Sequence, residues 1–169
     1  ITCFLRTKLR NEAFNMLNML VAHLKVPSWK SIFELMEVQN RTYSENKLLA
    51  DVILQIKVPP PFERMAEIVD LLLRLHDWRE TYNYFLEMSG QEISFNGLGK
   101  LIRVADTEAH FNIACQPVES NPEAESNLAL QTAKIIGLLK FQRLDEAKEL
   151  DAKRLEKHPR STDIYNAFI

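Results

Sequence analysis

The sequence has few of the residues that make tight turns in β structure. Only four glycines occur among its 169 residues, at positions 90, 97, 99 and 137. A two-residue β-hairpin needs glycine, often after asparagine or aspartate, and no such turn separates two alternating runs in this chain. Apolar residues recur instead at intervals of three and four, which is the period of an amphipathic helix. The sequence therefore predicts an all-α protein.

Cysteine and long apolar runs are also scarce. Cys3 and Cys115 are the two cysteines of the chain, whereas a secreted disulfide scaffold carries more of them at close spacing. We therefore expect an intracellular protein, cytoplasmic rather than nuclear. The densest apolar stretch, residues 68–75, is broken by Asp70 and Arg74 and is far shorter than the roughly 20 residues that cross a bilayer. We predict no membrane partner.

Metal and cofactor motifs are missing as well. The four histidines are far apart in the sequence: His23, His76, His110 and His158. They are not spaced as metal ligands, and the chain has no Cys-x-x-Cys pair. The segment Gly97-Leu98-Gly99-Lys100 hints at a phosphate-binding loop, but Leu101 follows the lysine and no glycine stands five residues before Gly99. We therefore predict no metal and no cofactor.

One pair of residues is a candidate for nucleophilic catalysis. His110 and Cys115 lie close in the sequence, but a Cys–His nucleophile needs a direct hydrogen bond and a third group that orients the base. The simpler interpretation is a helix cap followed by a polar turn. We do not expect an enzyme, and an enzyme without a recognisable motif is the third alternative.

The charge is small and unevenly distributed. The formal net charge is −2; residues 1–60 carry 8 − 5 = +3 and residues 61–169 carry 13 − 18 = −5. A nucleic-acid surface usually needs a strong basic stripe, so this bias is only weak support for RNA. The residues that would bind RNA under this alternative are in the N-terminal part: Arg6, Arg10, Lys25 and Lys30.

Caps and breakers predict nine helices. Their expected ranges are about 5–24, 29–36, 43–56, 61–75, 78–88, 95–105, 108–116, 122–139 and 144–157. The expected capping residues are Ser28, Thr42 with Glu45, Asp77 with Glu80, Ser94, Thr107 and Asn121. Pro117 is expected to end the seventh helix, because proline has no N–H donor and clashes with the preceding turn. Ser161 is expected to cap a last partial helix.

Two helix pairs repeat with a regular offset. Residues 77–81 at the turn of one pair align with residues 143–147 of another, and the offset is 143 − 77 = 66, or two units of 33. Tetratricopeptide repeats are helix pairs of 34 residues. Residues 126–160 resemble such a repeat, with Ala147 and Pro159 spaced as its small second-helix residue and its terminal proline. Ile135 departs from the pattern, because a small residue is expected there.

A second segment resembles a related family. Residues 59–88, which end in Tyr84-Phe85-Leu86-Glu87-Met88, are similar to a pentatricopeptide repeat. These resemblances imply antiparallel helix pairs stacked as a short right-handed α-solenoid over a single domain, residues 1–169. A non-repeating helical bundle is the alternative. Because the chain begins at Ile1 rather than at Met, we expect it to be a piece of a larger protein.

The solenoid resemblance implies an interaction scaffold that binds a partner helix or an extended peptide on a concave surface. The candidate contact residues are polar residues of first helices: Asn15, Asn18, Gln131 and Lys134. The alternative is an RNA-binding pentatricopeptide-like repeat, in which Trp29 and Trp78 would stack on bases rather than pack in the core. An exposed apolar groove would favour a protein partner. Basic clustering that also includes Arg41 would favour RNA.

Overall fold

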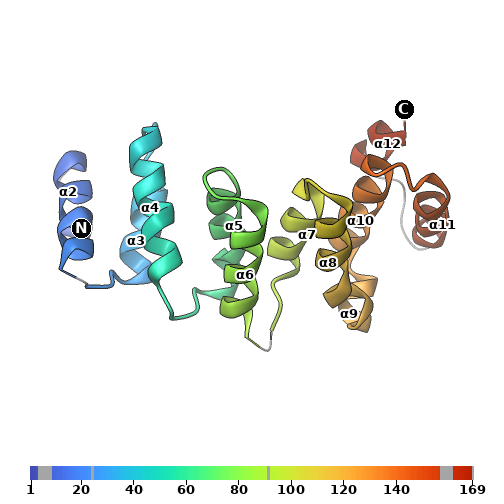
Figure 1. The fold of residues 1–169 in the computed structure, drawn as a ribbon, viewed down its shortest axis with the longest axis horizontal. Coiled ribbons are helices and arrows are strands. Elements are labelled where there is room, and N and C mark those ends of the chain that lie inside the picture. The colour runs from blue at the N-terminus through green and yellow to red at the C-terminus, as the bar shows by residue number, and fades with distance from the viewer. Residues whose placement is uncertain (4–8, 24, 91, 157–161, 169) are drawn as a thin grey trace.

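The computed structural model describes residues 1–3, 9–23, 25–90, 92–156 and 162–168, and these form an all-α fold without strands (Figure 1). Eleven α-helices and one 3₁₀ helix occur within the described residues, where nine helices were expected. Beyond these nine, the structure has α9, which is separate from α10, and α12 near the C-terminal end, where the sequence predicts a last partial helix. The predicted all-α class is confirmed, and the expected number of helices was too low.

Most helices begin and end close to the predicted positions. The first half contains α2 (Arg10–Ala22), α3 (Trp29–Met36), α4 (Tyr43–Gln55), the 3₁₀ helix η1 (Phe62–Arg64), α5 (Met65–Leu73) and α6 (Trp78–Ser89). The second half contains α7 (Phe95–Val104), α8 (Glu108–Glu119), α9 (Pro122–Ser126), α10 (Leu128–Lys140), α11 (Leu144–Leu155) and α12 (Thr162–Phe168). The predicted cap Ser161 lies outside the described residues.

The predicted side-chain caps are present. Each capping side chain accepts a hydrogen bond from a backbone N–H of the first helical turn. The capping residues are Ser28, Thr42, Asp77, Ser94, Thr107 and Asn121. Thr42 and Glu45 form the complete capping box, in which each side chain bonds the other residue's backbone N–H. These hydrogen bonds satisfy backbone N–H donors that have no partner within the helix. Because they are local, the capping residues could be predicted from the sequence.

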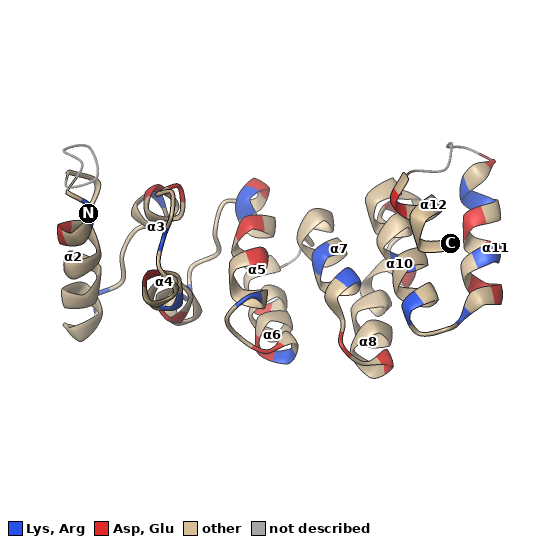
Figure 2. Cartoon of the chain, turned by 90° about the horizontal axis from the view of Figure 1, so that it is seen from above, with Lys and Arg blue, Asp and Glu red and all other residues tan. Residues whose placement is uncertain are grey.

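Most helices between α3 and α10 lie in two rows (Figure 2). Figure 2 shows α3, α5, α7 and α10 along one side of the chain, which we call row A, and α4, α6 and α8 along the other, which we call row B. In row A, α7 packs against both α5 and α10, and in row B α6 contacts α8. Buried apolar residues from both rows form one core cluster. Row A therefore brings helices from successive helix pairs side by side.

The sequence prediction that Pro117 ends its helix was wrong. Pro117 lies inside α8, which continues to Glu119. Because proline has no N–H, the carbonyl of Ile113 four residues earlier loses its helical hydrogen bond. The hydroxyl of Tyr82 in α6 donates to this carbonyl at 3.2 Å. Burial raises the pKa of Tyr82, so its hydroxyl remains a protonated donor.

The helix expected over residues 122–139 is two helices. Asn127 adopts an extended backbone conformation, with φ −73° and ψ 119°, and ends α9. Its Oδ1 accepts hydrogen bonds from the backbone N–H groups of Ala129 and Leu130, at 3.1 Å each. The same residue therefore stops one helix and caps the next.

Two glycines of neighbouring helices differ in how closely they are packed. A methyl group on Gly137 of α10 would lie 2.6 Å from Cδ2 of the buried Phe111 ring in α8. A methyl group on Gly99 of α7 would lie 3.7 Å from Cδ2 of Leu130, which is an ordinary van der Waals contact. The packing of α8 on α10 therefore requires glycine at position 137, whereas position 99 has room for alanine.

Candidate functional site

An open groove crosses row A between α5, α7 and α10, with a volume of about 630 Å³. We call it the central groove. The apolar part of its lining consists of Ala66, Leu73, Phe95, Gly99, Val104 and Ala129. Within this lining, Val104 is 47% exposed. The groove thus presents apolar surface to solvent between helices of successive pairs.

Three cations and one carboxylate make up the charged lining of the central groove. Asp70 of α5 pairs with Arg74, and its other oxygen lies 3.2 Å from Nζ of Lys100 in α7. Arg103 of α7 pairs with Asp163 of α12 at 3.1 Å. The lining carries a charge of 3 − 1 = +2, or 3 − 2 = +1 when the Asp163 carboxylate paired with Arg103 is counted, whereas residues 61–169 together carry −5. Positive charge is therefore concentrated in this groove, against the balance of the surrounding chain.

A second groove, of about 700 Å³, borders the loop between α3 and α4. We call it the loop groove. Its lining consists of residues 36–41, Tyr43, Asn46, Leu71, Arg74 and Leu75. Tyr43 is 69% exposed, and Arg74 lines both grooves. The two grooves therefore meet at Arg74.

The loop that borders this second groove is held from inside by Arg41. Its guanidinium donates to the carbonyls of Met36 and Val38, the latter at 2.8 Å, and to Oδ1 of Asn46 at 2.7 Å. The last carbonyls of a helix have no helical partner and form the negative end of its dipole. A cation at the end of α3 satisfies them. Burial lowers the pKa of Arg41, and arginine still remains charged at neutral pH.

Arg10 of α2 holds the same loop from the other side. It donates to the carbonyl of Asn40 at 3.0 Å and pairs with Glu45 of α4. Hydrogen bonds from Arg10, and then from Thr42, lower the pKa of Glu45 to about 2. Asn40 has a φ of 53°, a left-handed conformation that asparagine adopts more readily than most residues. The loop geometry is thus defined by polar contacts from α2 and α4.

The predicted partner-binding residues do not form one surface. Asn15 and Asn18 are exposed on α2 and line a groove of about 360 Å³ beside α4. Gln131 is half-buried and donates to a backbone carbonyl of α9 at 2.9 Å. The ammonium of Lys134 lies 2.7 Å from Oε1 of Glu119. None of these four residues lines the central groove.

The basic residues proposed for RNA are partly engaged within the fold. Arg10 and Arg41 bond carbonyls of the α3–α4 loop, and Arg6 lies outside the described residues. Lys25 and Lys30 are exposed, near the end of α2 and on α3. Two of the five residues whose clustering would favour RNA therefore already have a role inside the fold.

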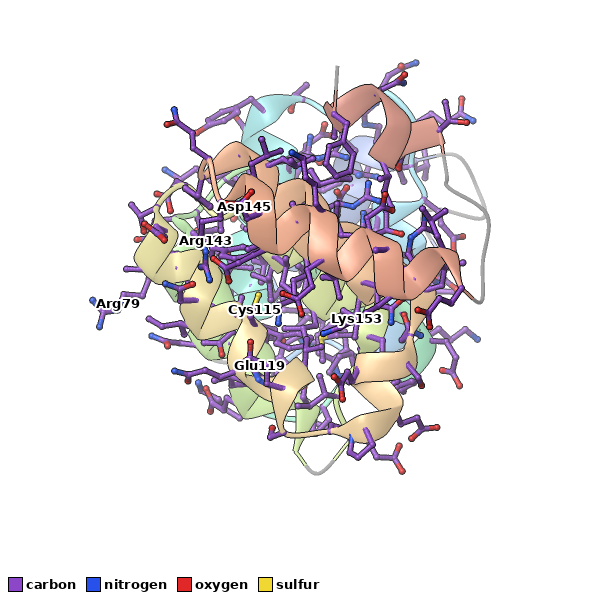
Figure 3. The ribbon with its side chains drawn as sticks, turned by 90° about the vertical axis from the view of Figure 1, so that its right-hand side faces the viewer. Arg79, Cys115, Glu119, Arg143, Asp145 and Lys153 are labelled. Carbon is purple, nitrogen blue, oxygen red and sulfur yellow. The ribbon has the colours of Figure 1, made fainter. Side chains whose placement is uncertain are left out.

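His110 and Cys115 do not form a catalytic pair. The His110 ring stacks on Trp78 with a centroid distance of 4.4 Å, and its Nδ1 pairs with Asp106. Cys115 is buried, and burial raises the pKa of its thiol to about 11. Figure 3 shows the Cys115 sulfur among packed side chains, whereas Arg79 points away from the helices. A protonated thiol is a poor nucleophile.

Each tryptophan bonds a backbone carbonyl outside its own helix. Nε1 of Trp78 in α6 donates to the carbonyl of Leu101 in α7 at 2.8 Å, and Nε1 of Trp29 donates to the carbonyl of Val58 at 2.9 Å. Trp78 is only 6% exposed, so its predicted core role is confirmed. Within the described part of the chain, no three His, Cys, Asp or Glu residues are placed to hold a metal ion. No described helix has the length and apolar character needed to cross a membrane.

Sequence reasoning did not single out Arg74, Lys100 and Arg103, which line the central groove. Arg74 follows the end of α5, and Lys100 and Arg103 lie on the amphipathic helix α7. The helical pattern assigns such charges to a solvated face. They come together only because α5 and α7 pack side by side. A usable signal was present in Gly97, since glycine inside a helix can indicate the close approach of a neighbour. A methyl group there would lie 2.9 Å from Cε2 of Phe85 in α6 and 3.4 Å from Cγ of Met65 in α5.

No family model, curated protein or solved structure matches this chain. The resemblance of residues 126–160 to a tetratricopeptide repeat and of residues 59–88 to a pentatricopeptide repeat therefore stays a prediction. Two helix pairs, α5–α6 and α10–α11, do lie at the positions expected for them, with turns at residues 74–77 and 141–143. Pro159 lies outside the described residues.

Proposed function

We propose that the chain is a short right-handed α-solenoid that binds a peptide segment of a protein partner in the central groove. One observation carries this proposal: apolar side chains of α5 and α7 are only partly buried, and Val104 is exposed, in a groove that also holds charged groups. Binding sites commonly combine an apolar lining with a few polar groups that fix orientation. An open groove across several helices accommodates an extended or helical peptide better than it encloses a small molecule.

The polar lining suits a peptide backbone. Asn96 is exposed in the groove, and its side chain offers both a hydrogen-bond donor and an acceptor. Peptide N–H and C=O groups need such partners when a segment is removed from water. The apolar lining would bury side chains of the same segment, which supplies most of the binding free energy.

A selection from a random displayed-peptide library tests this function. The purified chain is the target, and each enriched peptide is then measured by fluorescence anisotropy against two variants. Ala129→Trp fills the groove at the second residue of α10. Ala109→Trp is the matched control, because Ala109 is the second residue of α8 and is equally exposed.

We expect enriched peptides with affinities in the micromolar range, about −8 kcal/mol, that lose binding on Ala129→Trp and keep it on Ala109→Trp. Circular dichroism of both variants establishes that they are folded. A selection that enriches only peptides insensitive to Ala129→Trp, or no peptide at all, contradicts the proposed function.

A further inference from the structure

We infer that the segment bound in the central groove is acidic as well as apolar, an inference that rests on the proposed function. The groove lining carries +2, and +1 when the Asp163 carboxylate paired with Arg103 is counted, whereas residues 61–169 together carry −5. The charge of the groove is thus opposite in sign to that of the region around it. A surface of opposite charge steers the approach of an acidic partner and disfavours a basic one.

Asp70 is the one carboxylate of the groove lining, and it accepts hydrogen bonds from Arg74 and Lys100. Among the described residues, most N–H donors of these two cations stay available to a partner. Asp70 accepts one hydrogen bond from Arg74 and one from Lys100, whereas a guanidinium has five N–H donors and an ammonium has three. The side chains of Arg74 and Lys100 are 72% and 41% exposed. A carboxylate of the partner can therefore bond both cations while their contacts with Asp70 persist.

The arrangement of the groove also sets the pattern of the segment. Arg74 and Lys100 lie beside the apolar lining formed by Phe95 and Val104. An acidic residue at the cations therefore places a neighbouring apolar residue of the segment on that lining. Because Arg74 also lines the loop groove, the segment can continue past it toward the exposed Tyr43. The expected partner sequence combines Asp or Glu with large apolar residues.

The peptides selected on the wild-type chain test this chemistry. Those that lose binding on Ala129→Trp are the groove-dependent set, and their net charge is the first readout. Their affinities are then measured on Lys100→Glu, with Arg79→Glu as control, since Arg79 is exposed on α6 and points away from the helices (Figure 3). Lys100→Gln provides a milder variant, and loss of one exposed ion pair leaves the fold largely intact.

We expect groove-dependent peptides with a net negative charge. Lys100→Glu should weaken their binding about tenfold or more, and Arg79→Glu less than about twofold. A peptide whose acidic residues are replaced by lysine should bind Lys100→Glu better than it binds the wild type. This reversal distinguishes a direct charge contact from a general loss of structure.

Three other results would count against the inference. Groove-dependent peptides that are neutral or basic overturn it and leave the proposed function standing. A library that yields no groove-dependent peptide removes the proposed function, and this inference with it. A labelled oligouridine that binds more tightly than the selected peptides and depends on Lys100 would show that the groove recognises phosphates of a nucleic acid instead.

Discussion

Two regions of the chain hold their helices together in different ways. In residues 9–55, which hold α2 to α4, the arginines at positions 10 and 41 bond loop carbonyls and Glu45. In residues 95–140, which hold α7 to α10, the helices approach closely through Gly137 and pack on Phe111. We call these the polar section and the close-packed section. The difference indicates that the stability of the polar section depends on charge and pH. The stability of the close-packed section depends on side-chain volume.

The largest expected effect is in the close-packed section. Gly137→Ala places a methyl group against the buried ring of Phe111, and overpacking of this kind costs about 3 kcal/mol of unfolding free energy. Gly99→Ala is the matched control in another helix, and we expect it to be neutral or to stabilise by up to ~1 kcal/mol through helix propensity. Urea unfolding measures both, and equal midpoints for the two variants would refute the distinction.

The next effect is in the polar section. Arg41→Lys keeps the positive charge but loses the planar group that reaches the carbonyls of Met36 and Val38 and the amide of Asn46. We expect a loss of about 2 kcal/mol, because lysine cannot reproduce this set of hydrogen bonds. The same substitution at the exposed Arg79 should change stability by less than about 0.5 kcal/mol. Similar urea midpoints for both would show that the loop does not depend on Arg41.

A smaller effect is expected where α6 meets α8. Tyr82→Phe removes the donor to the Ile113 carbonyl and should cost about 1 kcal/mol. Pro117→Ala restores a backbone N–H that can take over this bond, so Tyr82→Phe should cost less in that background. A double-mutant cycle of thermal or urea unfolding measures the coupling. Additive effects would contradict our explanation of how α8 tolerates proline.

The smallest expected effect is a pH dependence of the polar section. The folded-state pKa of Glu45 is about 2, below its ordinary value of 4.5, so its contribution is present above about pH 4.5 and is lost as the pH falls toward 2. Arg10 is about a third exposed, and solvent screening limits the contribution to about 0.5–1 kcal/mol. Glu45→Gln should therefore destabilise at pH 7 and have little effect near pH 2. Glu12→Gln is the exposed control, and a constant difference across pH would contradict this assignment.

Local features of the fold could be predicted from the sequence, and contacts between distant helices could not. The caps at Ser28, Thr42 and Asp77 depend on residues three positions apart, so the sequence contains all the information they need. The continuation of α8 past Pro117 depends on Tyr82, which is 35 positions away (117 − 82 = 35). No reading of residues near the proline would reveal that donor.

The candidate site shows the same limit. The sequence favours Asn15 and Gln131 because they are polar residues on expected first helices. In the structure they lie apart from each other and outside the central groove. Lys100 and Arg74 become neighbours only when α5 and α7 are placed side by side. The sequence predicts which faces are polar, but the pairing of helices decides which charges meet.

The contact between Tyr82 and the carbonyl freed by Pro117 has an evolutionary consequence. Replacing Tyr82 by a residue without a donor while Pro117 is present leaves the Ile113 carbonyl without its hydrogen bond and destabilises the fold. If Pro117 is lost first, Tyr82 can be replaced without this cost. The order of substitutions is therefore constrained. Across homologues, we expect these two positions to covary, with proline at 117 found mainly where position 82 carries a hydroxyl or another donor.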